Sequence, residues 1–374
     1  MALAALFSAC GGGSSSSSSS STSEATEGSS GGSSTAALKE AEQYVAEYQQ
    51  VPQKIGLTEP LKKLPTGATV YYLQCGVPSC KQHGDGFEEA SKILGLNFKR
   101  VDAGTDPSTA AKAMETAVNG QADAVVSSGG FPAEIYKEQM KTLESRGAIV
   151  MNMGGAEPAG PEFGWTWVVQ GPEAWIQYGK LMADYAAVKM GGSGKLAWFN
   201  LPEISAFAKM GEGLVPEFER VCPDCEIETE EAKTSEVGSQ LPQQVVSYLQ
   251  RNPDTKYIAF ALGAMQTGVD PAIQAAGVGT DVKTFGYAGD ASNWEEIKKG
   301  SVQAADVAIP NVAFGWFAAD AVSRLLAGQE PEEPAPGKFP LPSQILEAKD
   351  LTFDLQEWPG APNYKEEFEE LWGV

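Results

Sequence analysis

The sequence predicts an α/β protein of two lobes, each a doubly wound parallel sheet, with crossing strands joining them. Two observations lead to this fold class. Short apolar segments alternate with amphipathic helical segments along most of the 374-residue chain, a pattern typical of parallel sheets with helices on both faces. These segments also fall into two successive series, and the roughly 340 residues beyond the N-terminal tail are enough for two separate cores.

Four strands are expected in the first series. Segment 70–74 (Val-Tyr-Tyr-Leu-Gln) is nearly all apolar, as expected of a strand buried on both faces. Asp106 and Pro107 have the pattern of a helix cap followed by a first-turn proline, and Gly120 ends the helical pattern that follows. The other strands are expected at 96–101, 122–128 and 149–153, with a helix at 133–145.

The second series repeats the alternation with similar element lengths. Its strands are expected at 195–200, 225–229, 257–261, 282–287 and 304–307. The helices between them are expected at 172–190, 206–221, 240–251, 264–276 and 311–327. Helices of this length between short apolar strands indicate right-handed crossover units and hence a second parallel sheet.

We expect the chain to divide into five parts. They are 1–35, a lipoprotein signal remnant and Ser/Gly-rich tether; 36–66, an N-terminal helix and connector; 67–164 with 309–338, the N-terminal lobe; 165–308, the C-terminal lobe; and 339–374, a crossing strand and C-terminal docking tail. In that tail Phe368, Leu371 and Trp372 recur at helical spacing, which predicts a helix docked on the second lobe.

A cysteine near the start has the surroundings of a lipoprotein cleavage site. Small and apolar residues lead to Cys10, and glycines and a run of serines follow it. Such a segment suits a signal peptidase, after which the cysteine carries the lipid. Phe7 stands where Leu is usual, and no Lys or Arg precedes Cys10, so a trimmed or mis-started signal is expected. The alternative is an ordinary N-terminal tail.

The other four cysteines form two close pairs. Cys75 and Cys80 are five residues apart, and Cys222 and Cys225 enclose Pro-Asp. In an exported chain the simplest interpretation is two local disulfides. A four-cysteine zinc site has similar spacings and stays open as an alternative, as does a redox role for the second pair.

Composition and motifs narrow the function classes. The formal net charge of −22 disfavours binding to nucleic acid. His83 is the single histidine, which removes most familiar acid–base, triad and zinc-hydrolase chemistry, and we expect it on the surface. Because the chain also lacks a nucleophile elbow, a P-loop and a dinucleotide fingerprint, we expect a protein that is not an enzyme and uses no cofactor or metal.

Several segments together resemble one known family. They are 72–78 (Tyr-Leu-Gln-Cys-Gly-Val-Pro), 85–90 (Asp-Gly-Phe-Glu-Glu-Ala), 210–213 (Met-Gly-Glu-Gly) and 285–287 (Phe-Gly-Tyr). In order and spacing they resemble the type I periplasmic binding proteins, the group that includes the ribose- and galactose-binding proteins of ABC importers. The resemblance covers about residues 69–329, and segment 56–76 with its cysteine loop is similar to an actinobacterial lipoprotein branch of sugar-type binding proteins.

The resemblance implies a ligand cleft between the lobes, beyond the carboxyl ends of their strands. Sugar-binding members clamp hydroxyls there with Asp, Arg and Asn side chains. The matching positions in this chain are Met153, Gly154, Ala208, Leu262, Gly263 and Ala288. Each buried hydroxyl left unpaired costs about 1–3 kcal/mol. We therefore expect weak binding of free sugars and a less polar, aromatic or substituted-sugar ligand.

Ten residues are predicted to contact that ligand: Gln74, Ser79, Ser127, Ser128, Gly129, Asn152, Met153, Phe207, Leu262 and Asp290. Phe207 is expected to be a cleft wall, the alternative being a core residue that opens a helix. A stacking role for Trp165 or Trp167 is the less favoured alternative to a place in the core.

The predicted function is that of a monomeric, lipid-anchored, extracytoplasmic receptor that hands a small molecule to an ABC permease. It contacts the membrane through the lipid alone. A ligand sensor for a membrane signalling receptor is built in the same way and stays open as an alternative. An enzyme on the same fold is the less favoured alternative.

Overall fold

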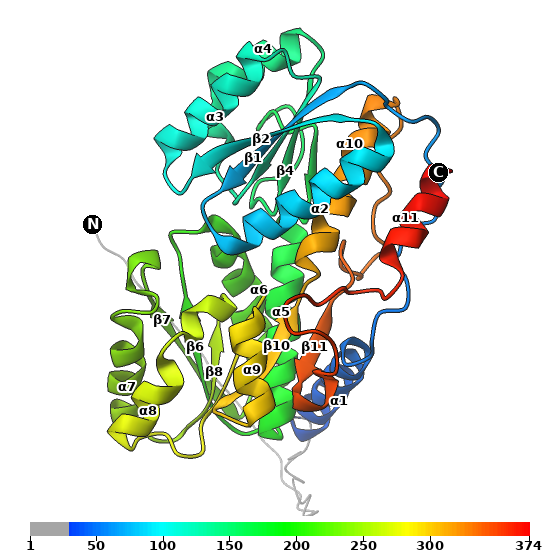
Figure 1. Ribbon diagram of the computed structural model, residues 1–374. Coiled ribbons are helices and arrows are strands. Elements are labelled where there is room, and N and C mark those ends of the chain that lie inside the picture. Colours follow the sequence, from blue (N-terminus) through cyan, green and yellow to red (C-terminus); the bar gives the residue numbers. More distant parts are fainter. Residues whose placement is uncertain (1–29) are drawn as a thin grey trace, which may run out of the picture.

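The computed structural model describes the backbone of residues 30–374 and the side chains of residues 35–374. The first of its two lobes contains a sheet of five parallel strands in the order β2-β1-β3-β4-β5 (Figure 1). The strands are β1 (Thr69–Cys75), β2 (Asn97–Gly104), β3 (Ala124–Ser128), β4 (Ile149–Met153) and β5 (Trp167–Val169). Residues 167–169 were assigned to the C-terminal lobe and no strand was predicted there, but they form β5, which pairs with β4 in the first sheet.

Helices cover both faces of the first sheet. One face carries α2 (Pro78–Leu94) and α10 (Asn311–Leu326), and the other carries α3 (Pro107–Asn119), η1 (Ala133–Tyr136) and α4 (Lys137–Ser145). Helices α2 and α10 pack backbone to backbone, because a Cβ on Gly86 would overlap the Val312 carbonyl oxygen, and one on Gly315 would overlap that of His83. The predicted cap of α3 is confirmed, since the Asp106 carboxylate accepts the amide hydrogens of Ser108 and Thr109.

The second lobe contains six strands in the order β11-β10-β9-β8-β6-β7. They are β6 (Gly194–Asn200), β7 (Cys225–Glu231), β8 (Thr255–Phe260), β9 (Lys283–Tyr287), β10 (Gln303–Ala308) and β11 (Gln344–Glu347). All neighbouring pairs are parallel except β10 and β11. The predicted fold class, two doubly wound and mainly parallel sheets, is therefore confirmed.

Two long helices of the second lobe form a tightly packed pair. Helix α5 (Pro172–Met190) lies against α6 (Ser205–Val221), where Gly179 faces the Met210 carbonyl and Gly213 faces that of Ile176. Helix α1 (Ser30–Tyr48) packs on both of them. The remaining helical segments of this lobe are η2 (Thr234–Glu236), α7 (Leu241–Arg251), η3 (Gly263–Gln266), α8 (Val269–Ala276), α9 (Ala291–Lys299) and η4 (Ala348–Asp350).

Segments from both ends of the chain run between the lobes. A connector, residues 49–66, leads from α1 on the second lobe to the first sheet, and a tail loop, residues 329–343, leads from α10 to β11 (Figure 1). The last helix, α11 (Tyr364–Trp372), was expected on the second lobe but packs on α10 of the first. The reason is an aromatic contact, in which Trp372 stacks on Trp316.

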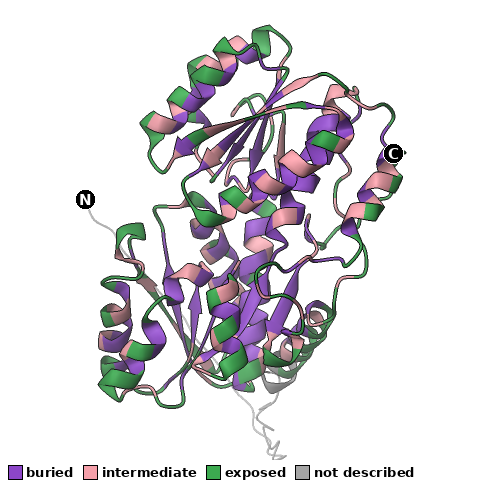
Figure 2. Ribbon diagram, viewed as in Figure 1, coloured by how far each residue is buried: buried purple, intermediate pink, exposed green. Residues whose placement is uncertain are grey.

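The central strands of both sheets are among the most buried parts of the molecule, whereas the edge strands β2 and β7 are mostly exposed or half-buried (Figure 2). Both predicted disulfides are present: Cys75–Cys80 joins the end of β1 to the first turn of α2, and Cys222–Cys225 joins the end of α6 to β7. Cys10 lies outside the described residues. Within residues 30–374 no helix is long and apolar enough to span a membrane.

Candidate functional site

The carboxyl ends of the parallel strands define one edge of each sheet, and ligands of open α/β sheets bind at this edge. Strand register places Ser127, Asn152 and Val168 side by side in the first sheet, one residue before the ends of β3 and β4. Gly129 and Gly154 follow these strands with φ of 84° and 79°, a left-handed conformation that favours glycine. The backbone therefore turns sharply just where a ligand is expected.

An aromatic cluster of Trp175, Phe207 and Tyr287 connects this edge of the first lobe to the second. The Trp175 ring centroid is 5.9 Å from that of Phe207 and 5.4 Å from that of Tyr287, with both pairs edge to face. A Cβ on Gly154 would lie 3.4 Å from Trp175 Cζ2, so the indole reaches the end of β4. The three rings come from the first turns of α5 and α6 and the end of β9.

Gln170 lies at the crossing from β5 to α5 and ties the lobes together. It has a φ of 61°, and its side-chain amide donates to the Tyr287 hydroxyl at 2.8 Å. Burial raises the pKa of Tyr287 well above its usual range, so this hydroxyl stays neutral. The Gln170 Oε1 atom is buried and has no hydrogen-bond partner.

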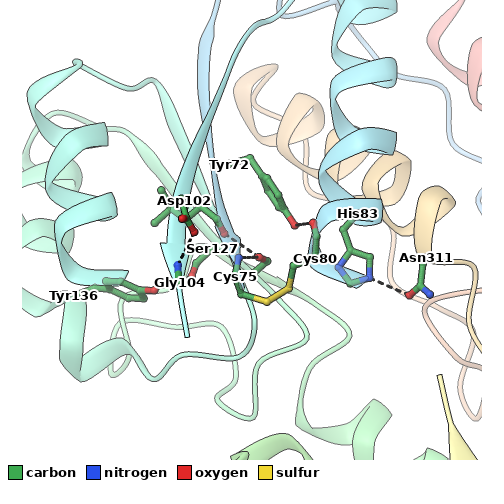
Figure 3. The surroundings of a disulfide bond; sticks show 11 residues. Tyr72, Cys75, Cys80, His83, Asp102, Gly104, Ser127, Tyr136 and Asn311 are labelled. Carbon is green, nitrogen blue, oxygen red and sulfur yellow. Dashed lines mark hydrogen bonds between the residues drawn. A yellow bond between two sulfur atoms is a disulfide. The ribbon is translucent and has the colours of Figure 1, made fainter. Parts of the chain in front are cut away.

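Ser127 and Ser128 lie at the predicted edge, but their hydroxyls bond within the first lobe. Ser127 Oγ is 3.1 Å from the Tyr136 hydroxyl (Figure 3). Ser128 Oγ donates to the Leu73 carbonyl at 2.8 Å and accepts the Cys75 amide hydrogen at 3.0 Å. These hydrogen bonds join Ser127 of β3 to η1 and Ser128 of β3 to β1. Both hydroxyl groups therefore have structural partners and are less available to a ligand.

Asn152 keeps one atom free at the end of β4. Its side-chain amide donates to the Phe131 carbonyl at 3.4 Å, while Oδ1 is buried without a partner. Met153 follows it, is buried, and belongs to the same core cluster as the aromatic cluster. Among the first-lobe residues predicted to contact the ligand, Asn152 and Met153 therefore have the side chains best suited to do so.

Gln74 and Ser79 flank the Cys75–Cys80 disulfide. Gln74 Oε1 accepts from Arg100 at 3.2 Å, and Arg100 also pairs with Asp85 and Glu88 of α2. The side-chain carbonyl oxygen of Gln74 is thus occupied by a hydrogen bond from Arg100 of β2. Ser79 lies half-buried in the first turn of α2.

His83 was expected on the surface, and the structure shows it buried between α2 and α10. Its Nε2 atom is 3.2 Å from Asn311 Oδ1 (Figure 3), and the ring packs edge to face on Phe314. Burial lowers the pKa of His83 to about 4, against a smaller opposing effect of the Asn311 hydrogen bond. The imidazole is therefore neutral at physiological pH, and it links α2 to the start of α10 within the first lobe.

The predicted second-lobe residues separate into two groups. Phe207 is 6% exposed and contacts Trp175, and Leu262 is half-buried at the end of β8. Asp290 instead caps α9, because its carboxylate accepts the amide hydrogens of Ser292 and Asn293. This carboxylate is committed to the helix end, so the structure gives it no role in the aromatic cluster.

A buried carboxylate, Asp306 of β10, fixes the loop after β9 by hydrogen bonding. Asp306 Oδ1 accepts the Gly289 amide hydrogen at 2.9 Å, and Oδ2 accepts the Trp294 indole hydrogen at 3.0 Å. Burial raises the pKa of Asp306 to about 7 despite these two bonds. Ala288, at the position where sugar-binding members carry Asp, has a φ of 50° and offers no polar side chain.

We call the region formed by Asn152, Gln170 and the aromatic cluster of Trp175, Phe207 and Tyr287 the interlobe edge. It is mainly aromatic, with a few unpaired polar atoms. The buried atoms without a partner there are Asn152 Oδ1, Gln170 Oε1 and Trp175 Nε1, which amount to two acceptors and one donor. Among the described residues, no group of three or more His, Cys, Asp or Glu side chains is placed to hold a metal ion. This composition suits recognition of a small, partly apolar molecule.

Sequence reasoning missed Trp175, Tyr287 and Gln170. Trp175 had a usable signal, because it falls in the first turn of the helix that opens at Pro172, directly after the crossing from the first lobe. Trp165 is buried and donates to Glu157, so it belongs to the core. Trp167 is half-buried, packs against the main core cluster and lines a cavity between the connector and the tail loop.

Two lobes of this kind, each built on a mainly parallel sheet, define a two-lobed α/β fold. The model of one family, described as the periplasmic binding protein domain, matches residues 78–330, and the chain belongs to this family. No curated protein matches the sequence.

Solved structures with the same fold share little sequence with this chain. A 5-methylthioribose transporter solute-binding protein from Thermotoga lettingae has a TM-score of 0.66 at 16% identity, covering 84% of this chain and 99% of its own. An ABC sugar transporter subunit from Rhodobacter sphaeroides has 0.64 at 20%, covering 76% and 99%. A periplasmic ribose ABC transporter protein from Conexibacter woesei has 0.64 at 20%, covering 77% and 94%.

Proposed function

We propose that this protein is an extracytoplasmic solute-binding protein that captures a small molecule between its lobes and delivers it to an ABC permease. The observation that carries the proposal is the cluster of Trp175, Phe207 and Tyr287, which joins the ends of both parallel sheets. In this proposal the protein is a monomer anchored to the outer face of the cell membrane through Cys10. The ligand leaves chemically unchanged.

The proposed ligand is less polar than a free pentose or hexose. The positions of the charged clamps are occupied by Met153, Ala208, Leu262 and Ala288, so few charge-assisted hydrogen bonds are available to pay for burying many hydroxyls. Aromatic faces bind flat or apolar groups well. A substituted sugar fits this balance, and it is of interest that one structural neighbour was solved with 5-methylthioribose.

The first experiment identifies the ligand and asks whether it is altered. The protein is purified from its native host, denatured, and the released small molecules are identified by mass spectrometry. The compound found is then incubated with fresh protein and measured by calorimetry and thermal unfolding. We expect saturable binding, a raised melting temperature and full recovery of unchanged compound. Turnover above background would contradict the proposal.

The second experiment tests the site. Phe207→Ala should weaken binding of that compound by roughly 1–3 kcal/mol, the range for a lost buried aromatic contact. Phe353→Ala is the matched control, because Phe353 packs on Trp294 in a separate cluster at the chain's tail. Ribose, glucose and galactose should bind weakly or not at all. Tight binding of an unmodified sugar that is indifferent to Phe207→Ala would reject this site.

A further inference from the structure

A cavity of about 820 Å³ lies between the lobes on the side of the connector and the tail loop. Its walls are β5, the first half of α5, the middle of α10, residues 55–57 of the connector and residues 332–340 of the tail loop. The volume is in the range of small-molecule sites, about 300–1,000 Å³. The connector and tail-loop walls lie outside residues 78–330, the part matched by the family model.

Half of the six charged residues in the walls are already paired. Asp320 bonds to Arg324 and Trp372, Glu332 accepts the backbone amides of Thr58 and Glu59, and Lys338 pairs with Glu47. These contacts hold the connector and tail loop in place and leave no charge from these residues for a ligand.

Two carboxylates in the walls have no cationic partner. Glu173, in the first turn of α5, and Glu333, in the tail loop, form no ion pair or hydrogen bond among the described contacts of residues 35–374. Burial and the nearby charge of Glu173 both raise the pKa of Glu333. Lys180 is also in the wall but is exposed and lies two helical turns from Glu173, about 10 Å along α5, so it does not neutralise this pair.

Most of the remaining wall is apolar, the polar exceptions being Gln170, Gln177 and Lys180. It includes the half-buried Trp167 indole and the Phe339 ring, together with Pro158, Pro172, Pro334, Pro336 and Pro340. Gln170 is a wall residue as well, and its buried Oε1 atom has no partner. Aromatic faces attract organic cations, most strongly when water is excluded.

We propose that this cavity is a second binding site, for a small organic cation with an apolar body, and that it shares the wall residue Gln170 with the interlobe edge. The ammonium group lies between Glu173 and Glu333, and the apolar part lies against Trp167 and the prolines. Because β5 and α10 belong to the first lobe and α5 to the second, an occupant contacts both lobes at once. The inference does not depend on which solute the interlobe edge binds.

Benzyltrimethylammonium is the probe, with benzyl alcohol as its neutral counterpart, and binding is measured by calorimetry on the full chain. We expect saturable binding of the cation in the millimolar range or tighter, and binding of the alcohol at least tenfold weaker. Glu173→Gln combined with Glu333→Gln should weaken cation binding at least tenfold. The effect should shrink as salt is raised, as expected for partly exposed charges.

Two control variants separate this site from its rivals. Glu162→Gln changes an exposed carboxylate outside the cavity and should leave the affinity for the cation unchanged. Phe207→Ala changes the interlobe edge and should also leave it unchanged. The proposal is overturned if no saturable binding is seen, if the double variant binds as the parent does, or if Phe207→Ala abolishes binding. The last outcome would place the cation at the interlobe edge.

Discussion

The indole of Trp372 lies flat on that of Trp316, with ring centroids 5.4 Å apart and planes 9° apart. The same indole donates its N–H to Asp320 Oδ1 at 2.9 Å. Asp320 in turn pairs with the buried Arg324, whose guanidinium donates to the Glu59 carbonyl. One aromatic contact therefore secures α11, α10 and the connector to the first lobe.

Trp372→Ala should lower the free energy of unfolding by about 3–5 kcal/mol, since it removes a buried aromatic side chain. Trp372→Phe keeps most of the ring contact and loses only the hydrogen bond to Asp320, so a loss of about 1–2 kcal/mol is expected. Urea unfolding followed by circular dichroism measures both. Equal stability of Trp372→Ala and the parent would show that α11 is not held by this contact.

Gly213→Ala should destabilise the second lobe by roughly 1–3 kcal/mol or more, because the new Cβ overlaps the Ile176 carbonyl oxygen of α5. Gly211→Ala, two residues earlier in the same helix, is the matched control. Its Cβ would lie 3.3 Å from the Trp198 indole nitrogen, and the gain in helix propensity, up to about 1 kcal/mol, offsets this close contact. The melting temperature of Gly213→Ala should therefore be well below that of Gly211→Ala. The reverse order would contradict the close approach of α5 and α6.

Asp184 should make stability depend on pH. This carboxyl is buried in α5, and burial, with the nearby Glu217, raises its pKa to about 7, above the usual 3.8. The folded protein then keeps a proton that the unfolded chain releases. The contribution of this carboxyl to stability is therefore fully present below about pH 4 and is lost as pH rises toward 7, by at most about 1.4 kcal/mol per pH unit. Asp184→Asn removes this contribution, so its free energy of unfolding should rise relative to that of the parent between pH 5 and pH 8.

The comparison is made by urea unfolding of both proteins at several pH values. Asp306 has a raised pKa of about 7 as well, and it is present in both proteins, so it cancels in the difference. Parallel curves for Asp184→Asn and the parent would mean that Asp184 is already ionised in the folded state at pH 5.

Thiol titration of unfolded, unreduced protein should detect at most one free cysteine, Cys10. The other four form the disulfides Cys75–Cys80 and Cys222–Cys225. Reduction should release four more thiols and lower the melting temperature, because small rings restrict the unfolded chain. Detection of all thiols before reduction would show that both pairs are open in solution.

Much of the fold follows from local pattern. Continuous apolar segments identified the long strands, and Asp106 with Pro107 marked the start of α3 where it is found. Strand β5 was harder, because its three residues are too short for any periodicity. The placement of α11 depended on the partner of Trp372, and Trp316 lies 56 positions earlier on α10, so spacing within the tail carried no information about it.

The site was less accessible to sequence reasoning for the same reason. His83 is buried by Asn311 and Phe314, more than two hundred residues away, and nothing in its own segment indicates this. Ser128 lies at the predicted edge, yet its hydroxyl bonds to the backbone of β1, which only the strand order reveals. Phe207 and Met153 lie in the same core cluster as Trp175, and their role as a ligand surface stays a prediction.

The glycine contacts inside each lobe restrict how this molecule can change shape. Gly86 and Gly315 bring α2 and α10 together in the first lobe, and Gly179 and Gly213 do the same for α5 and α6 in the second. Backbones in direct contact cannot slide past each other without steric overlap, so each helix pair is expected to move as one unit. For the proposed ligand capture we therefore expect a rotation of the lobes about the chain crossings, which a pair of probes, one in each lobe, would follow.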